Sequence, residues 1–194
     1  PQLLQRACRL QQLWCELRLS KLNPARESPA PNAPFVLVVD QSAGDCSIAL
    51  GQAGQQQFQQ MLQAALRDHP DCTVVVKVHP DVIRGRARGH FRRRDLQHPR
   101  IQICADGLHP AALLEQAQAV YVVTSQMGFE ALLWGRPVHC FGMPFYAGWG
   151  LTQDRLSQPE RRTARPGLEA LVHAALIAGS RCLDPHCLQP APIE

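Results

Sequence analysis

The sequence predicts an α/β protein built on a doubly wound, mostly parallel, Rossmann-like sheet. Short apolar runs rich in β-branched residues alternate with amphipathic segments of helical periodicity. These runs lack the polar alternation of half-exposed strands, as expected when helices cover both faces of a parallel sheet. Parallel neighbours require crossover connections, so the alternation of strands and helices implies double winding.

The first 34 residues are predicted to precede the sheet. Leucines and Trp14 recur at helical spacing to about Leu19, which predicts an amphipathic helix within residues 1–22. Four prolines within residues 23–34 indicate a linker. The chain begins without Met and in what reads as mid-helix, so we expect it to be a piece of a longer protein.

The α/β domain is predicted to cover residues 35–180, beginning with the apolar strand at 35–39. A helix follows, with Phe58, Met61 and Leu62 on one face and glutamines on the other. The later elements, in order, are strands at 73–78 and 101–104, a helix at 110–118, a strand at 120–123, a helix at 126–134, a strand at 138–141 and a helix at 168–178. The tail at 181–194 is predicted to be irregular.

Composition excludes several classes of protein. The net charge of +4 comes largely from the arginines between residues 84 and 94, which argues against a nucleic-acid binder. No apolar stretch reaches the roughly 18 residues of a membrane span, and the N-terminus lacks the core of a signal peptide.

Eight scattered cysteines without a CxxC pair are typical of buried thiols in a reducing compartment, so we expect a cytoplasmic protein. Cys182, His186 and Cys187 are close in sequence, but a zinc site needs about four ligands. We therefore expect no metal.

Unusual polar residues fall where the predicted strands end. Asp40 and Asp45 follow the first strand. The others are Lys77 and His79 at the second, Asp106 at the third, Thr124 and Ser125 at the fourth, and residues 142–150 after the fifth. Ligands of open parallel sheets bind at this carboxyl edge, so we expect the segments to converge on one crevice.

Three of these residues suit a phosphorylated ligand. Ser125 directly precedes a helix, where amide donors favour an anion, although a plain capping role is an alternative. His79 sits on a stiff His-Pro turn and either donates to a phosphate or is structural. Lys77 interrupts an apolar strand, where a charge would be costly unless it reaches an anion, a base or the cleft.

Four stretches of sequence resemble the capsular-polysaccharide β-Kdo transferases of the KpsC type. They are VVTSQMGFEALL at 122–133, CFGMPFYAGWGLT at 140–152, DQSAGDCSI at 40–48 and KVHPD at 77–81. The resemblance implies the donor-binding half of a GT-B glycosyltransferase. Such enzymes transfer Kdo from CMP-Kdo, with retention of the β configuration, to a lipid-linked Kdo acceptor in capsule biosynthesis.

The resemblance also implies roles for individual residues. Lys77 would approach the cytosine, and His79, Thr124 and Ser125 would contact the phosphate. Asp106 is a weaker candidate for the ribose hydroxyls. Glu130, one turn into the following helix, either bonds ribose or is a carboxylate on the helix surface. No cofactor is implied beyond the donor.

Retention normally means two inversions, and two inversions need a nucleophile on the protein. The resemblance points to Asp45 and leaves Asp40 as the fallback, while either aspartate could instead cap the helix expected after Gly51. Tyr146 and Trp149 would form a sugar-stacking platform or pack at a domain seam.

The expected partners are the CMP-sugar, the lipid-linked acceptor at the inner membrane and other capsule assembly proteins. Peripheral contact with that membrane is compatible with the arginine loop, which would meet acceptor carboxylates or anionic lipid, or be simply solvated. Two other functions stay open: a non-catalytic nucleotide- or glycan-binding module, and a GT-B-like sugar-nucleotide epimerase or phosphohydrolase.

Overall fold

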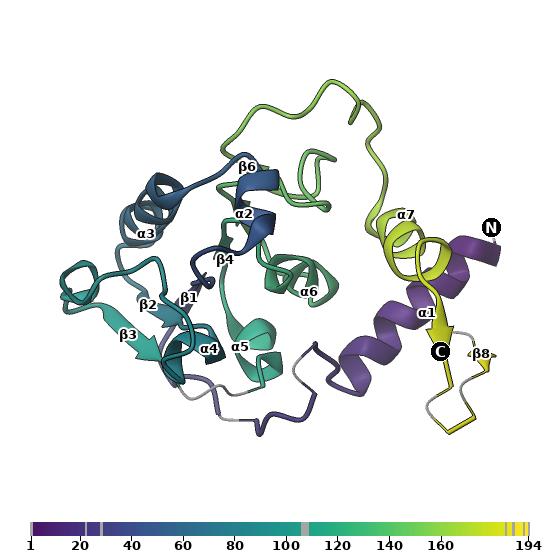
Figure 1. Ribbon diagram of the computed structural model, residues 1–194, viewed down its shortest axis with the longest axis horizontal. Coiled ribbons are helices and arrows are strands. Elements are labelled where there is room, and N and C mark those ends of the chain that lie inside the picture. The colour runs from purple at the N-terminus through teal and green to yellow at the C-terminus, as the bar shows by residue number, and fades with distance from the viewer. Residues whose placement is uncertain are drawn as a thin grey trace.

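The computed structural model describes residues 2–21, 23–27, 29–105, 109–184, 186–187, 189–191 and 193. Within them, a six-stranded parallel sheet has the order β3-β2-β1-β4-β5-β6 (Figure 1). The strands are β1 (Phe35–Val39), β2 (Thr73–Lys77), β3 (Ile101–Cys104), β4 (Val120–Val122), β5 (Val138–Cys140) and β6 (Gln153–Asp154). The predicted fold class is confirmed.

Strand β1 lies at the centre of the sheet, between β2 and β4. Its register pairs Phe35 with Thr73 on one side and Leu37 with Val120 on the other. The chain adds β2 and β3 on one side of β1 and then returns to add β4, β5 and β6 on the other. The direction of winding therefore switches between β1 and β4, and ligands bind at such a switch point in open α/β sheets.

Helices cover both faces of the sheet. Val36 and Val38 pack in one apolar cluster with α3 (Gln55–Asp68) and α2 (Cys46–Leu50). Phe35 and Leu37 point the other way, into a cluster with α5 (Ala111–Gln116) and α6 (Met127–Leu133). Figure 1 shows α3 and α5 on opposite sides of the strands. All five residues of β1 are buried, which explains why its sequence shows no polar alternation.

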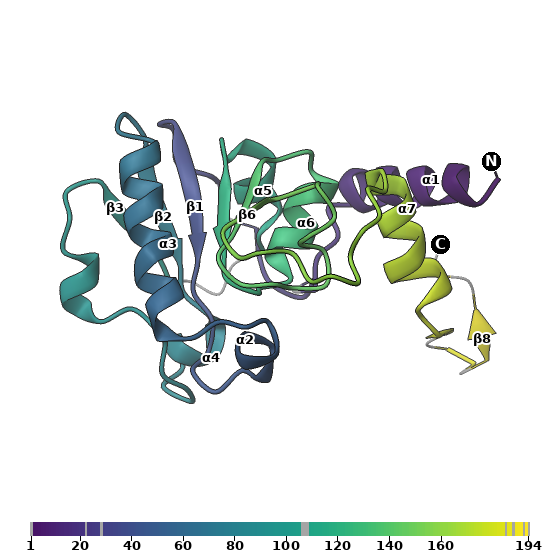
Figure 2. The same cartoon turned by 90° about the horizontal axis from the view of Figure 1, so that it is seen from above.

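The N-terminal helix α1 (Gln2–Glu16) packs along α7 (Leu168–Val172), at the end of the molecule away from β3 (Figures 1 and 2). It ends before the predicted limits of Leu19 and residue 22. Arg18 has a left-handed backbone with φ of 52°, which ends the helix. Its guanidinium also bonds Glu27 and Glu115 and so directs the chain toward the sheet.

Several short elements depart from the predictions. The last predicted helix is α7 followed by a π-helical segment, η2 (His173–Ala178), and the tail expected to be irregular pairs β7 (Cys182–Leu183) with β8 (Pro190–Ala191). The elements α2, β6, α4 (Pro80–Ile83) and the 3-10 turn η1 (Arg93–Leu96) were not predicted. They span only two to five residues each, too few to show a period.

Candidate functional site

Residues at the carboxyl ends of β1, β2 and β4 gather around two adjoining pockets. The Lys77 pocket is lined by Lys21, Val39, Asp40, Lys77, Val78, His79, Ser125 and Met127. The Asp45 pocket, with a volume of about 290 Å³, is lined by Lys21, Gln41, Asp45, Ser47, His79, Thr124, Ser125, Gln126 and Phe145. In Figure 2 the arrow of β1 points toward α2 and α4, which flank this edge of the sheet.

The structure therefore brings together six of the eight residues selected from the sequence: Asp40, Asp45, Lys77, His79, Thr124 and Ser125. Glu130 lines neither pocket. Asp106 lies outside the described residues. The segment after β5 contributes Phe145 to the Asp45 pocket, as its place after a strand end predicted.

Gln41, which the sequence reasoning passed over, bridges the two strands at the switch point. Its amide nitrogen donates to Asp45 Oδ2 at 3.2 Å and to Thr124 Oγ1 at 3.0 Å, and its amide oxygen accepts the Thr124 N–H at 2.9 Å. Gln41 is buried, so these bonds satisfy a side chain that water does not reach. It directly follows the Asp40 strand end, and that position was the signal that could have identified it.

Asp45 caps α2, and its surroundings stabilise the ionised carboxylate. Its Oδ1 accepts the Ser47 N–H at 2.9 Å, and Gly44, with φ of +88°, makes the preceding turn. Burial acts to raise the pKa of Asp45, but hydrogen bonds from Ser47 and Gln41 outweigh it and lower the pKa below its ordinary value. The side chain is exposed at the pocket, so the ionised carboxylate is accessible to a ligand.

Asp40, in contrast, is buried, and its environment favours the protonated carboxyl group. It is only 4% exposed, and Oδ1 accepts the N–H groups of Gln41 at 2.9 Å and His90 at 3.1 Å. Burial raises the pKa of Asp40 to about 6, although these backbone bonds oppose the rise. A Cβ at Gly89 would collide with Asp40 Oδ2, so the carboxyl group packs tightly against the arginine-rich loop.

His79 is fixed by Ser42 and Asp81. Its Nδ1 lies 3.1 Å from the Ser42 hydroxyl and accepts the Asp81 N–H at 3.2 Å. An accepting Nδ1 selects the neutral tautomer with a proton on Nε2. Burial lowers the pKa of His79, although the charge of Asp81 opposes this. The ring is thus a neutral donor that lines both pockets.

The remaining predicted donor contacts are also at the site. Thr124 Oγ1 lies 3.0 Å from the Ser47 hydroxyl. Ser125 Oγ accepts the N–H of Met127, the first residue of α6, at 3.3 Å, and Ser125 also lines both pockets. Lys77, the last residue of β2, is buried at the Lys77 pocket.

Glu130 has no exposed surface, so its interpretation as a carboxylate on the helix surface is wrong. Its Oε1 accepts the Lys21 N–H at 3.4 Å, and the Ser20 hydroxyl also donates to the carboxylate. Within the described part of the chain Oε2 has no hydrogen-bond partner. Burial raises the pKa of Glu130, against the effect of the bonds from Ser20 and Lys21. Contact with ribose stays a prediction.

Tyr146 and Trp149, predicted to form a sugar-stacking platform or to pack at a domain seam, both pack against the apolar core after β5. Tyr146 is fully buried, and its hydroxyl donates to the Ser125 carbonyl. Trp149 donates from Nε1 to the Phe145 carbonyl at 2.7 Å and lies under the Arg162 guanidinium. Phe145, which is 47% exposed, is the aromatic ring that lines the Asp45 pocket.

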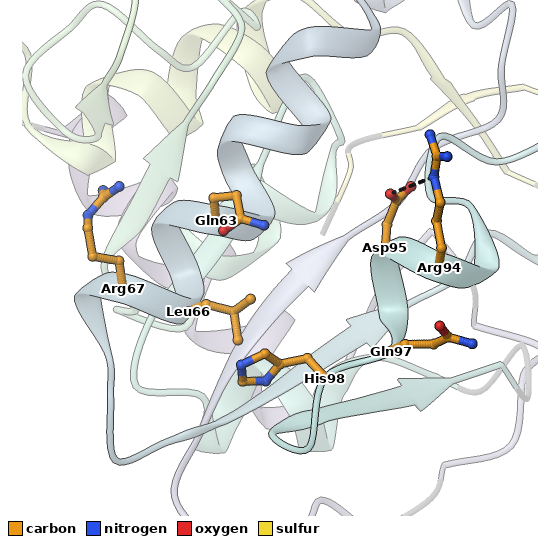
Figure 3. Close-up of a pocket in the computed structure, with 7 residues that line it drawn as sticks. All are labelled: Gln63, Leu66, Arg67, Arg94, Asp95, Gln97 and His98. Carbon is orange, nitrogen blue, oxygen red and sulfur yellow. Dashed lines mark ion pairs between the residues drawn. The ribbon is translucent and has the colours of Figure 1, made fainter.

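A larger pocket, of about 560 Å³, lies away from this site, between α3 and residues 94–98 (Figure 3). It is near the amino end of β3, because the Ile101 N–H bonds the His98 carbonyl. Its arginines pair with neighbours: Arg67 with Asp68 and Arg94 with Asp95. The pocket is thus separate from the strand-end site.

Among the described residues, no group of three or more His, Cys, Asp or Glu side chains is arranged to hold a metal ion. Of the helices within these residues, none has both the length and the apolar character needed to cross a membrane.

The strand order and the pockets at the switch point define a doubly wound α/β protein with a polar ligand site at its carboxyl edge. Residues 4–181 match the family described as "capsule polysaccharide biosynthesis protein". The chain belongs to this family.

Two curated relatives are similar over most of the chain. The capsule polysaccharide modification protein LipA of Neisseria meningitidis serogroup B is 42% identical over 174 residues, which are 87% of this chain and 24% of LipA. The lipopolysaccharide-processing protein LpsZ of Rhizobium meliloti is 36% identical over 90% of this chain and 40% of LpsZ. The chain thus spans about a quarter to two fifths of these relatives.

Two solved structures from Thermosulfurimonas dismutans have the same fold. The KpsC β-Kdo 2,4 transferase superposes with a TM-score of 0.92 and 40% identity, over the whole of this chain and 61% of its own. The KpsC β-Kdo 2,7 transferase gives a TM-score of 0.76 and 29% identity, over 98% of this chain and 58% of its own.

Proposed function

We propose that the protein is a capsule glycosyltransferase that transfers Kdo from CMP-Kdo, with retention of the β configuration, to a lipid-linked Kdo acceptor. Its similarity to two Kdo transferases supports the sugar and the class of reaction. The observation that carries the proposal is the Asp45 pocket, where a carboxylate with a lowered pKa lies beside Lys21 and several neutral polar groups at the switch point.

The proposed reaction has two displacements at the anomeric carbon. In the first, an Asp45 oxygen forms a bond to the anomeric carbon while the bond between that carbon and the phosphate oxygen breaks. CMP leaves with the electron pair of the broken bond. In the second, the acceptor hydroxyl displaces Asp45 and loses its proton to solvent. Two inversions restore the original configuration.

The other residues would hold the donor and its leaving group. Lys77 and His79, at the end of β2, would contact the cytosine and the phosphate, with Thr124 and Ser125 on the opposite side of the switch point. Fixed donors stabilise charge as it develops on a leaving phosphate. This arrangement requires no metal ion or cofactor besides the donor.

The acceptor places the reaction at the cytoplasmic face of the inner membrane, among other capsule assembly proteins. Six exposed arginines between residues 84 and 94 lie on the loop that docks on Asp40: Arg84, Arg86, Arg88, Arg92, Arg93 and Arg94. Near an anionic surface each cation adds about 1 kcal/mol of attraction.

Thermal denaturation with CMP, UMP, UDP and ADP tests the choice of nucleotide. CMP at a hundred times its Kd should stabilise the protein by about 2.7 kcal/mol, because only the folded state binds it. The other three nucleotides should have little effect. A preference for UDP would instead support an epimerase, and stabilisation by none of them would support a module without a nucleotide site.

A further inference from the structure

The two lysines of the chain meet at the same pocket. Of 20 basic residues, only Lys21 and Lys77 are lysine, and both line the Lys77 pocket. Lys77 is carried by the sheet. Lys21 comes from the segment between α1 and β1, and it also lines the Asp45 pocket.

The backbone that carries Lys21 is held in place. Its N–H donates to Glu130 Oε1 at 3.4 Å, and the neighbouring Ser20 is buried with its N–H bonded to Asn23 Oδ1 at 2.7 Å. Just before this turn, Arg18 is tied to Glu115 of α5 at 2.9 Å. The Lys21 side chain itself is exposed, so a fixed backbone presents a cation at the mouth of the site.

Three residues line both pockets: Lys21, His79 and Ser125. An ammonium group, a neutral imidazole N–H and a hydroxyl are all groups that bind phosphate oxygens. In a sugar nucleotide the phosphate joins the nucleoside to the sugar. A phosphate bound by these three residues would lie where the two pockets meet, at the junction between nucleoside and sugar.

We propose that Lys21 is a further donor-binding residue that contacts the phosphate, and that Glu130 is a positioning residue that holds the turn carrying Lys21. This inference rests on the proposed function. The positive charge of Lys21 acts to lower the pKa of each of Asp45, His79 and Glu130. The ammonium group therefore lies among the residues of the site. The segment before β1 is then part of the donor site.

Isothermal titration calorimetry tests the role of Lys21. Lys21→Met should weaken CMP binding about tenfold at low ionic strength and leave cytidine binding unchanged, because cytidine lacks the phosphate. Lys21→Arg should restore most of the affinity. Arg26→Met removes a nearby cation from the same segment but outside both pockets, and it should bind CMP like the parental protein.

Three other outcomes would contradict the inference or the function on which it rests. Equal CMP affinity of the Lys21→Met and parental proteins overturns the inference, and so does weaker binding of CMP-Kdo with unchanged binding of CMP, which would assign Lys21 to the sugar carboxylate. A parental protein that fails to bind CMP at all overturns the proposed function itself.

A double-mutant cycle with Glu130→Leu tests the positioning role, because leucine removes the oxygen that accepts the Lys21 N–H. If Glu130 acts through Lys21, Glu130→Leu should weaken binding of CMP but not of cytidine, and it should add little to the effect of Lys21→Met, whereas Glu130→Gln should retain most of the affinity. Additive effects, or equal losses of CMP and cytidine affinity, would show that Glu130 acts independently of Lys21. Amine labelling read by mass spectrometry gives a second measurement: CMP, but not cytidine, should protect Lys21 in the parental protein.

Discussion

At the scale of single residues, two aspartates five positions apart have opposite properties. Asp45 caps a short helix at the surface of the pocket, and donors lower its pKa. Asp40 is buried below the arginine loop, and burial raises its pKa to about 6. A nucleophile must be ionised and accessible at neutral pH. These environments favour Asp45 as the nucleophile. Asp40 instead accepts hydrogen bonds from backbone N–H groups.

In a complete enzyme that is active in transfer, Asp45→Asn should abolish transfer without preventing donor binding. Asparagine caps helices as well as aspartate does, so α2 should persist, but the amide cannot attack the anomeric carbon. We expect CMP affinity to survive while the rate of transfer falls roughly a thousandfold or more. Mass spectrometry of the parental protein with CMP-Kdo and no acceptor should find a Kdo adduct on the peptide containing Asp45.

Asp40→Asn serves as the matched control for that experiment. It should still form the adduct, because Asp40 bonds the backbone rather than lining the Asp45 pocket. Substantial transfer by the Asp45→Asn protein, or an adduct on another carboxylate, would contradict the assignment.

The raised pKa of Asp40 predicts a pH-dependent difference in stability. Because its pKa of about 6 in the folded protein is above the usual 3.8, the folded state binds this proton more tightly than the unfolded state does. The parental free energy of unfolding therefore decreases, relative to Asp40→Asn, as pH rises from 4 to 7, by up to about 3 kcal/mol. Urea denaturation of both proteins at each pH measures this. A difference that is constant with pH would show that Asp40 titrates normally.

At the scale of elements, the turn after β1 and the arginine loop hold each other in place. The Ala43 N–H bonds the Arg88 carbonyl at 2.6 Å, and the His90 N–H bonds Asp40. The His90 ring stacks on Phe58 of α3, with 3.8 Å between ring centroids. The loop that carries the exposed arginines is thus anchored to the same turn that presents Asp45.

Gly89→Ala should release this loop, because the added Cβ would collide with Asp40 Oδ2. Trypsin cleaves after arginine, so the exposed arginines report directly on loop order. We expect cleavage between residues 84 and 94 to be several-fold faster in the variant, since local opening limits proteolysis of ordered segments. Gly54→Ala is the control, because its Cβ would meet no atom closer than 3.9 Å. Equal cleavage rates in all three proteins would show that the loop is not anchored through Gly89.

At the scale of the whole molecule, the site lies at the edge of one large sheet. The described residues contain a single six-stranded sheet and a two-stranded hairpin, whereas GT-B enzymes act in a cleft between two domains. The chain also spans 61% of the KpsC structure with the higher TM-score. The donor contacts proposed above all come from this chain, but the acceptor contacts are not assigned to it.

We therefore predict that the 194-residue chain, tested by itself, binds CMP and transfers little or no Kdo. Calorimetry with CMP and a transfer assay on a synthetic Kdo-lipid acceptor measure the two properties separately. The KpsC β-Kdo 2,4 transferase of Thermosulfurimonas dismutans is the positive control for the assay. Robust turnover by the isolated chain would show that all catalytic groups lie within it.

Much of the architecture could be predicted because it follows from local patterns. The run at 35–39 is apolar throughout since β1 is covered on both faces, and the alternation of strands and helices leaves a parallel sheet as the consistent arrangement. Parallel strands end at one edge, so residues such as His79 and Ser125 could be placed in one site before any contact was known. Elements of a few residues, such as α2 and β6, carry too little pattern to be recognised.

The sequence by itself determined the class of fold, the edge of the sheet that holds the site and most of the residues there. Only the tertiary structure decided which groups contact one another and in which ionisation state. Gln41 bonds Thr124 across 83 positions of sequence and Glu130 bonds Lys21 across 109, and burial separates the pKa values of Asp40 and Asp45. Periodicity reports how a segment meets its immediate surroundings, whereas burial and long-range hydrogen bonds depend on residues that only folding brings together.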